Sequence, residues 1–433
     1  MNITSLRKII ANEISKHAIY FKNTVQFCPR EEDEGNLFSY VKCKNKNIIH
    51  DVESIKKFTT DDDATLFVLN GTFNFSLDIE GLLNNIKPQL NRASRLTVVG
   101  YNPYFRFLFK LANKLGLRKG EIPSTFITRT DLNNLCFLSG FEIVKFTPAG
   151  FLPLPVIGLF LEKILRNIPL VNLFSISAII TLRPVIAEKD MPSLSIVIPA
   201  RNEKGNIEGA LIRLIEFAKE IPTEIIFVEG HSSDDTWGEI KRVAPIYESH
   251  FKKIQFFQQT GKGKNDAVRL GFKNSTSKLL TILDADLTMP PELLPRFYHA
   301  YRTGKADFIN GSRLLYPMEG EAMRFLNHLG NIFFAKALSF VLNTRIGDSL
   351  CGTKLVSAKD YKRFVEWRND FGDFDPFGDF ELIFPASYLG LGIIDIPIQY
   401  KARVYGETNI SRFRHGFILL KMTLFGFFKI KLG

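Results

Sequence analysis

The sequence lacks the marks of several large protein classes. Its cysteines are widely spaced and show no paired zinc-binding pattern, so we expect reduced thiols in the cytosol: Cys28, Cys43, Cys136 and Cys351. No dense Lys/Arg run or nucleic-acid-binding module occurs, and we therefore expect no nucleic-acid partner. Residues 1–17 lack the apolar core of a signal peptide, and no stretch reaches about 18 uninterrupted apolar residues, so no membrane-spanning helix is predicted.

The bulk composition indicates a multidomain protein with an anionic partner. The 433 residues suffice for two or three domains, and 45% of them are hydrophobic, which allows each domain a core. The net charge of +11 favours acidic lipid headgroups or phosphorylated substrates. Many of the 40 phenylalanines lie near basic residues at the C-terminal end.

Residues 278–291 are central to the interpretation. Leu279–Leu283 predict a buried strand that runs directly into Asp284-Ala285-Asp286. Two carboxylates at the end of a parallel strand face the crevice where α/β proteins bind ligands. They suit Mg²⁺ or Mn²⁺ on a substrate diphosphate. The competing interpretation is a solvated loop with a helix-capping aspartate.

The first part of the chain alternates strands with helices, which predicts βαβ units. Residues 1–60 are polar and weakly patterned. The predicted strands cover residues 64–69, 95–100, 141–146 and 178–182, and the predicted helices cover residues 79–90 and 130–139. We expect Gly140 to end the second helix as a C-cap.

Residues 60–184 resemble the C-terminal half of a class I S-adenosylmethionine-dependent methyltransferase. The resemblance rests on a strand that ends at Tyr101-Asn102-Pro103 and on Ser139-Gly140-Phe141 before the last hairpin. It implies a partial Rossmann-like methyltransferase remnant over residues 1–184. Residues 1–60 hold a single glycine, Gly35, so the cofactor loop is missing and we expect no S-adenosylmethionine. The expected role of this domain is structural: dimerisation, docking, or covering of the second domain.

A linker and a second domain follow. Residues 150–181 predict a buried helix pair, with membrane contact as the alternative. Residues 185–192 are the predicted linker. Strands at residues 194–198, 224–228, 253–257 and 279–283 then alternate with helices, which indicates a doubly wound nucleotide-binding α/β domain over residues 193–412.

Five motifs in this second domain resemble family 2 glycosyltransferases with the GT-A fold. They are SIVIPARNE, VEGHSSDDT, GKGKNDAVRLGF, LDADLTMPP and NGSR, in that order. The polyprenyl-phosphate hexose synthases are the most similar group. The resemblance implies that the nucleotide sugar is bound by Pro199, Ala200, Arg201, Glu203, Glu229, Gly263 and Asp284. Glu229-Gly230-His231 departs from the usual Asp-Asp-Gly, which leaves the base open. The alternative for Arg201 and Glu203 is a surface ion pair.

The same resemblance assigns the chemistry. Asp284 and Asp286 are expected to hold the metal, with Lys262 and Arg313 as cations on the departing diphosphate. Asp379 is the candidate base for a hydroxyl acceptor, and the alternative is a helix N-cap.

Three nearby residues receive simpler interpretations. Lys264 is expected to be solvated, Asp266 to support its helix, and Cys351 to lie in the core.

A loop and a tail complete the chain. The loop is expected to close over donor and acceptor, with Arg403, Tyr405, Thr408, Asn409 and Arg412 as contacts. Residues 413–433 form a basic amphipathic tail, which either lies on an anionic membrane or packs on the catalytic domain.

These observations predict a metal-dependent inverting glycosyltransferase at the cytoplasmic face of the membrane. It would move a hexose from a nucleotide sugar to a lipid-linked acceptor such as polyprenyl phosphate. Two alternatives stay open: a sugar-hydroxyl acceptor in a surface glycan, and a non-catalytic nucleotide-sugar-binding scaffold. A homo-oligomer also stays open.

Overall fold

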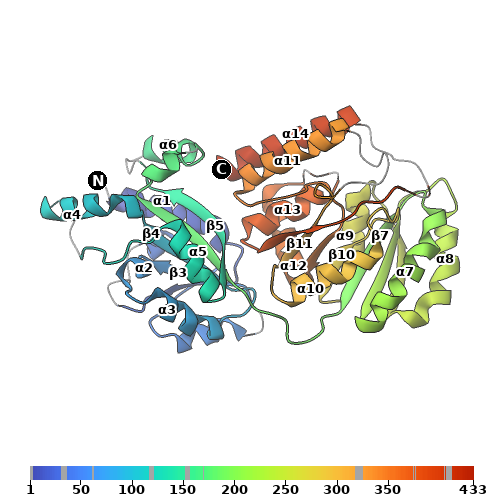
Figure 1. Cartoon of the computed structure of the whole chain (residues 1–433), viewed down its shortest axis with the longest axis horizontal. Helices are drawn as coiled ribbons and strands as arrows, with labels where there is room; N and C mark the ends of the chain where they lie inside the picture. Colours follow the sequence, from blue (N-terminus) through green and yellow to red (C-terminus); the bar gives the residue numbers. More distant parts are fainter. Residues whose placement is uncertain are drawn as a thin grey trace. The chain divides into compact units, whose positions relative to one another are not determined.

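The structure is a computed structural model of the whole chain, shown in Figure 1. It describes residues 3–30, 37–60, 63–116, 121–151, 157–168, 170–316, 325–373, 375, 377–403, 405 and 412–433. The chain divides into two compact units. Unit 1 comprises residues 1–186, 388–390 and 430–433, and unit 2 comprises residues 187–387 and 391–429. The predicted linker, residues 185–192, spans the boundary.

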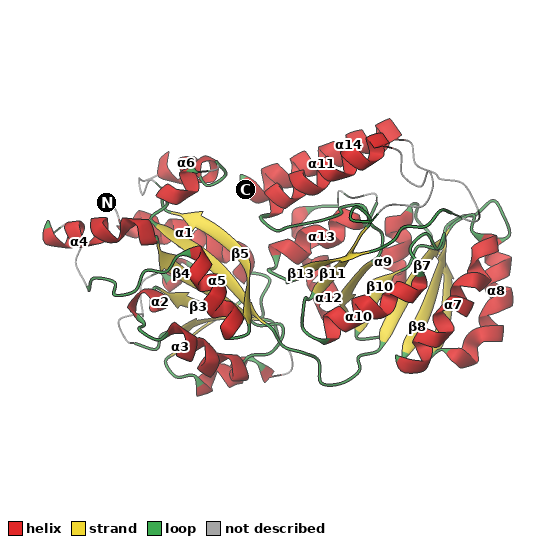
Figure 2. Cartoon of the chain, viewed as in Figure 1, coloured by secondary structure: helices red, strands yellow, loops and turns green. Residues whose placement is uncertain are grey.

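Unit 1 contains helices and one mixed sheet (Figure 2). Its elements are α1 (Ile3–Ala18), β1 (Asn23–Phe27), β2 (Asn45–Ile49), β3 (Thr65–Asn70), α2 (Thr72–Phe75), α3 (Ile79–Ile86), β4 (Arg95–Tyr101), α4 (Arg106–Lys114), α5 (Arg129–Leu138), β5 (Phe141–Ala149), α6 (Ile157–Leu165) and β6 (Ser177–Pro184).

The sheet of unit 1 has the strand order β2-β1-β3-β4-β6-β5. The first four strands are parallel, and β6 pairs antiparallel with both β4 and β5. The predicted strands β3 to β6 and helices α3 and α5 are confirmed, and Gly140 ends α5 with a φ of 67°. Residues 1–60, which are weakly patterned in sequence, contribute three elements that were not predicted: α1, β1 and β2.

The predicted helix pair over residues 150–181 is also wrong. Within the described part of this stretch, residues 157–165 form α6, and the chain then passes through a short 3₁₀ turn into β6. The apolar residues at 178–182 therefore belong to a sheet that is buried between layers. Ile179, Ile180 and Leu182 are all buried.

Unit 2 holds the larger sheet and its covering helices. Its elements are β7 (Leu194–Ala200), α7 (Ile207–Glu220), β8 (Thr223–Glu229), α8 (Thr236–Tyr247), β9 (Lys253–Gln258), α9 (Lys264–Asn274), β10 (Leu279–Ile282), η10 (Pro291–Leu293), α10 (Leu294–Arg302), β11 (Phe308–Ser312), α11 (Phe325–Leu342), β12 (Lys354–Ser357), α12 (Ala358–Phe371), α13 (Asp379–Tyr388), β13 (Ile393–Pro397) and α14 (Arg412–Gly426).

The seven strands of unit 2 lie in the order β13-β11-β12-β10-β7-β8-β9. Strands β10, β7, β8 and β9 are mutually parallel, and β12 runs antiparallel between β10 and β11. Because β7, β8 and β10 read as nearly continuous apolar runs, they can be buried on both faces. Their carboxyl ends meet at one edge of the sheet, and this edge carries the predicted site residues.

The C-terminal helix α14 packs against α11 within unit 2 (Figure 1). Leu419 and Met422 of α14 are buried, whereas Phe417 is 71% exposed. Among the described residues, no helix is both long enough and apolar enough to cross a membrane.

The core of unit 2 yields a stability prediction. Leu214 on α7 is fully buried in the main cluster, and Leu214→Ala is expected to cost about 2–5 kcal/mol of unfolding free energy. Ile212 lies on the same helix and is 51% exposed, so Ile212→Ala serves as the control, with a loss below about 1 kcal/mol. Urea unfolding measures both. Equal losses would contradict the burial of Leu214.

Candidate functional site

The candidate site lies at the carboxyl ends of β7, β8 and β10. Each of these strands is followed by a non-glycine residue with left-handed backbone: Asn202 (φ 58°), His231 (φ 57°) and Leu287 (φ 54°). Such backbone is costly for residues with a Cβ and collects at functional sites. Its occurrence after three adjacent strands makes this edge of the sheet the candidate site of unit 2.

The loops after β7 and β8 hold each other. The Asn202 side-chain oxygen accepts the Ser233 N–H at 2.7 Å, and the Ser232 hydroxyl accepts the Asn202 N–H at 3.0 Å. These reciprocal bonds fix the two loops as one surface. Arg201 is exposed on it, directly after Ala200 at the end of β7.

Glu203 is a buried acid in the first loop. Its carboxylate accepts hydrogen bonds from Asn206 at 2.6 Å and from Arg403 at 2.9 Å. Burial raises the pKa of Glu203, and these two donors oppose the increase. The alternative of a surface ion pair between Arg201 and Glu203 is wrong, because Glu203 is buried and pairs with Arg403 instead.

Glu229 closes β8 and is also buried. Its carboxylate accepts the Ser232 N–H at 2.6 Å and the Gln258 side-chain amide at 3.0 Å. Burial alone would raise the pKa of Glu229, but these hydrogen bonds outweigh it and lower the pKa. Glu229 therefore presents a charged carboxylate that shapes the turn at His231.

Asp284 and Asp286 follow β10, and both carboxylates are paired with cations. Lys264 from the start of α9 forms an ion pair with Asp284. Burial favours the neutral form of Asp284, but the charge of Lys264 prevails and lowers its pKa. Asp286 accepts the Thr288 hydroxyl at 2.7 Å on one oxygen and Arg403 at 2.7 Å on the other.

Arg403 thus joins two strand ends. One guanidinium nitrogen contacts Glu203 after β7, and another contacts Asp286 after β10. Tyr405 follows two residues later, and its ring lies over Gly205, where an added Cβ would come within 2.6 Å of the ring. Glycine at position 205 therefore makes room for Tyr405.

A second layer of buried ion pairs supports the site. Arg313 forms a two-pronged pair with the fully buried Asp348, at 2.7 and 2.9 Å. Lys354, whose side chain is 1% exposed, pairs with Asp379 at the start of α13. A Cβ at Gly352 would collide with the Asp284 carboxylate and the Lys264 amine, so this glycine makes room for their ion pair.

Asp375, not Asp379, accepts the free amides at the start of α13. Its carboxylate takes the N–H groups of Phe377, Phe380 and Glu381 at 2.7–2.9 Å. Burial and the neighbouring charge of Asp379 raise the pKa of Asp375 to about 6. The N-cap interpretation of Asp379 is therefore wrong, and the Asp379 carboxylate is left to the buried pair with Lys354.

The predicted residues divide into three groups. Glu203, Asp284, Asp286 and Arg403 are brought together by direct contacts or shared partners, and Arg313 acts on the Asp284 charge. Lys262 and Gly263 lie exposed in the loop before α9, and their roles stay predictions. Thr408 and Asn409 lie outside the described residues, and Arg412 begins α14.

Three further predictions concerned Lys264, Asp266 and Cys351. Lys264 was expected to be solvated, and this was wrong, because it pairs with Asp284. Asp266 was expected to support its helix, but its carboxylate accepts the Gly261 N–H at 3.1 Å, which belongs to the loop before α9. Cys351 lies in the core as expected, where burial raises the pKa of its thiol to about 12.

Sequence reasoning missed the ion pairs of Lys264, Asp348 and Lys354 and the capping role of Asp375. For Lys354 a signal existed, because it precedes the apolar Leu355 and Val356, and a lysine in a buried strand needs a buried partner. Asp348 carried none, since only the fold brings it near Arg313. Asp375 accepts amides that follow it closely in the chain, and an acid just before a helix is a capping signal.

Comparisons with known proteins address the identity of unit 2. Residues 195–364 match the family model described as Glycosyl transferase family 2. A dolichyl-phosphate hexose transferase of Haloferax volcanii is 27% identical over 231 residues, which cover 53% of this chain and 92% of that protein. A dolichol-phosphate mannosyltransferase of Pyrococcus furiosus is 31% identical over 121 residues, which cover 28% of this chain and 33% of that protein.

Solved structures add a more distant similarity. The glucosyl-3-phosphoglycerate synthase of Mycobacterium tuberculosis, crystallised with Mn²⁺, UDP and glucosyl-3-phosphoglycerate, is 16% identical with a TM-score of 0.41. The similarity covers 55% of this chain and 81% of that one. The family match confirms the predicted family 2 glycosyltransferase domain, and the matched range covers the loops after β7, β8 and β10. Residues 195–364 thus form a glycosyltransferase family 2 domain, and the protein is a glycosyltransferase.

Proposed function

We propose that the protein transfers a hexose from a nucleotide sugar to a lipid-linked acceptor, most simply polyprenyl phosphate, with inversion at the anomeric carbon. The observation that carries this proposal is the meeting of Glu203, Asp284, Asp286 and Arg403 at the carboxyl ends of β7 and β10. The names of the two curated relatives, a dolichyl-phosphate hexose transferase and a dolichol-phosphate mannosyltransferase, support the acceptor class.

The donor would bind across the strand ends of a GT-A fold. In this proposal the nucleotide lies on the joined loops at Ala200–Glu203 and Glu229, and its diphosphate reaches Asp284 and Asp286. Lys264, Lys354 and Arg313 all lower the pKa of Asp284 by their charge, so three cations lie near this part of the crevice. Cations held in a half-buried site stabilise the charge that develops on a leaving diphosphate.

The acid pair suits a hard divalent cation. Among the described residues no cluster of three or more His, Cys, Asp or Glu side chains could hold a metal. Magnesium commonly takes only one or two carboxylates and completes its shell with water and substrate phosphate, so Asp284 and Asp286 fit it. Bound there, Mg²⁺ or Mn²⁺ would supply Lewis-acid stabilisation of the leaving group. Arg403 would have to leave Asp286.

Peripheral attachment to the inner face of the membrane completes the proposal. Helices α11 and α14 pack on each other and carry exposed large apolar side chains: Leu329, Phe333 and Phe340 on α11, and Phe417, Leu420 and Leu424 on α14. Lys336 and Lys421 are exposed on the same two helices. Apolar groups with interspersed lysines favour an anionic membrane surface.

For unit 1 we propose a degenerate methyltransferase-like domain without S-adenosylmethionine. The antiparallel hairpin of β5 and β6 at the end of a parallel sheet supports this. Dimerisation or docking remains its proposed role.

The metal role is tested at Asp286. Asp286→Ala is expected to lower transfer from nucleotide sugar to a prenyl phosphate by at least about 1,000-fold, because it removes one of two carboxylates at the diphosphate. The control is Asp235→Ala, which removes an exposed acid whose described partner is Lys204. Circular dichroism checks that both variants fold. Full transfer by a folded Asp286→Ala protein would refute the site.

A second prediction concerns Arg403 as a competitor of the metal. Arg403→Ala is expected to tighten Mn²⁺ binding in the absence of nucleotide by about tenfold, because the metal no longer displaces an ion pair from Asp286. Lys204→Ala removes an equal charge from the neighbouring loop and should change binding less than about twofold. Electron paramagnetic resonance of free Mn²⁺ gives both constants. Weaker binding in Arg403→Ala would contradict the competition.

Asp379→Asn separates the two acceptor classes. A lipid phosphate is already ionised, so the variant should lose no more activity than Lys354→Gln, which breaks the same buried pair but keeps the carboxylate. A hydroxyl acceptor needs a general base, and Asp379→Asn would then lose about 100- to 10,000-fold beyond Lys354→Gln. Turnover numbers of both variants, each checked for folding by its melting temperature, decide between the acceptors.

A further inference from the structure

Two helices of unit 1 leave its sheet at the same edge. Strands β4 and β5 both pair antiparallel with β6, so β4 and β5 run in the same direction. Helix α4 follows the carboxyl end of β4, and α6 follows the carboxyl end of β5. Both helices therefore lie at the carboxyl edge of the sheet, as Figure 1 shows. In α/β domains this is the edge where ligands bind.

Asn102 joins the segment of α4 to the segment of α6. Its side-chain amide donates to the carbonyls of Leu173 at 2.8 Å and Ser175 at 2.7 Å. Leu173 belongs to the 3₁₀ turn η7 (Val171–Phe174), which follows α6. The Asn102 side-chain oxygen accepts the Tyr104 N–H at 3.0 Å, at the start of the turn that leads into α4. The two segments are thus held together as one surface.

One side of helix α4 packs on unit 1, and another side is an exposed apolar stripe. Phe109 is buried, and its ring lies against Tyr101 and Phe126 with centroids 4.9 and 5.8 Å away. The other large apolar side chains of this segment recur at helical spacing and are exposed: Tyr104, Phe107, Leu108, Leu111 and Leu115. A rigid apolar stripe of this kind is expected to be covered by a partner.

The segment of α6 and η7 extends the apolar surface. Phe174 is 65% exposed, as much as Phe107 on α4, which is 64% exposed. Further exposed large apolar side chains of this segment are Ile164, Ile168, Leu170 and Leu173. Because Asn102 joins the two segments, their apolar side chains belong to one face of unit 1.

Positive charge borders this face, and exposed acids are absent from the two described segments. Arg106, Lys110 and Lys114 are exposed and recur every four residues, which makes one row along α4. Residues 101–120 contain no aspartate or glutamate in the sequence. The one acid of α6, Glu162, is buried, and its carboxylate accepts the Gly150 N–H at 2.8 Å.

This combination favours an anionic membrane over a second copy of the chain. A two-fold contact through the face would bring the cations of both α4 helices together, and like charges oppose association. Phenylalanine and leucine on one side with lysine and arginine on another are typical of helices that lie in the membrane interface. Anionic headgroups attract such cations.

We propose that α4, α6 and η7 form a membrane-binding face of unit 1, with Phe107, Leu111 and Phe174 in the interface of an anionic bilayer and the cations of α4 on the lipid headgroups. This face is separate from the surface of α11 and α14, and it gives unit 1 a docking role. The inference goes beyond the proposed transfer reaction and does not depend on it.

Vesicle sedimentation of the full chain, without donor or acceptor, tests the apolar stripe. Phe107→Gln with Leu111→Gln is expected to weaken binding to vesicles that contain phosphatidylglycerol at least about tenfold, because two apolar side chains no longer enter the interface. The control, Ile212→Gln with Ile246→Gln, makes the same change at exposed positions of α7 and α8 and should stay within about twofold of the natural chain.

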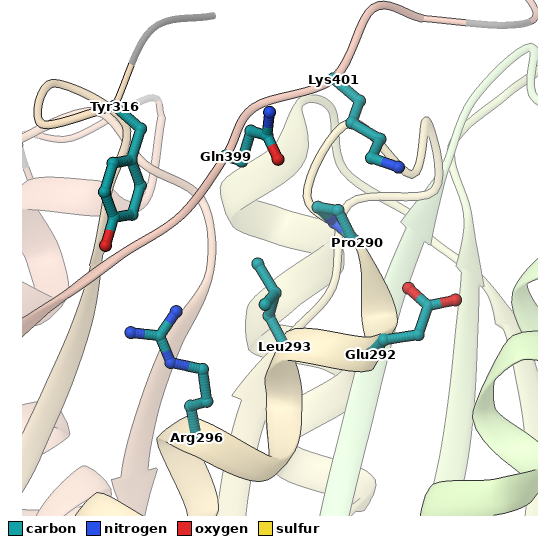
Figure 3. A pocket seen from close by; sticks show the side chains of 7 residues that line it. All are labelled: Pro290, Glu292, Leu293, Arg296, Tyr316, Gln399 and Lys401. Atoms are coloured by element: carbon teal, nitrogen blue, oxygen red, sulfur yellow. The ribbon is translucent and has the colours of Figure 1, made fainter.

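A second pair of variants tests the row of cations. Lys110→Gln with Lys114→Gln is expected to weaken binding to the same vesicles at least about fivefold. The control, Arg296→Gln with Lys401→Gln, removes the same charge from unit 2, where both side chains are exposed and line a pocket of about 650 Å³ (Figure 3). It should stay within about twofold of the natural chain.

The outcomes separate the possible partners of the face, and melting curves by circular dichroism check that each variant folds. Equal binding by the variants and their controls would overturn the membrane face while leaving the proposed function intact. Equal binding of the natural chain to pure phosphatidylcholine would overturn the anionic preference. A lipid-free dimer that Phe107→Gln with Leu111→Gln makes monomeric would show that a second copy covers the face. Insertion itself is expected to let brominated lipids quench the added fluorescence of a Phe107→Trp protein, and no quenching would contradict it.

Discussion

One guanidinium, that of Arg403, neutralises two acids that come from different strand ends of the same sheet. Glu203 and Asp286 lie close enough to share it, at 2.9 and 2.7 Å. Carboxylates this close repel unless a cation lies between them, so the edge of the sheet depends on a positive charge being present. A divalent ion with a diphosphate can meet the same need, which gives one crevice two ways of balancing its charge.

The rest of unit 2 holds in place Glu203 and Asp286, the two acids that require a cation between them. Buried pairs, Arg313 with Asp348 and Lys354 with Asp379, hold the strands on the other side of β10. Such pairs tolerate little movement, because losing one partner leaves a charge buried without compensation. The segment after β13 places Tyr400 beside Arg313 and Arg403 on Asp286, so it belongs to the same network of charges.

Sequence patterns predicted the parts of this site that depend on neighbours in the chain. Asp284 and Asp286 follow an apolar run, and the loops after β7 and β8 follow similar runs. The sequence alone therefore predicted that these residues lie at the ends of buried strands. Strands β1 and β2 could not be predicted from the sequence, because β2 is a polar edge strand and β1 buries the polar side chains of Thr24 and Gln26. The pairing of Lys264 with Asp284 depends on a contact that only the folded chain creates.

A thermal-shift panel of nucleoside diphosphates with and without Mn²⁺ tests the central claim most directly. The account predicts that one nucleotide raises the melting temperature only when the metal is present. At about 100 times its dissociation constant, such a ligand adds about 2.7 kcal/mol, which corresponds to a few degrees. A metal-dependent shift would also identify the base that the loop at Glu229 selects. No shift with any nucleotide in the presence of Mn²⁺ would contradict the donor site.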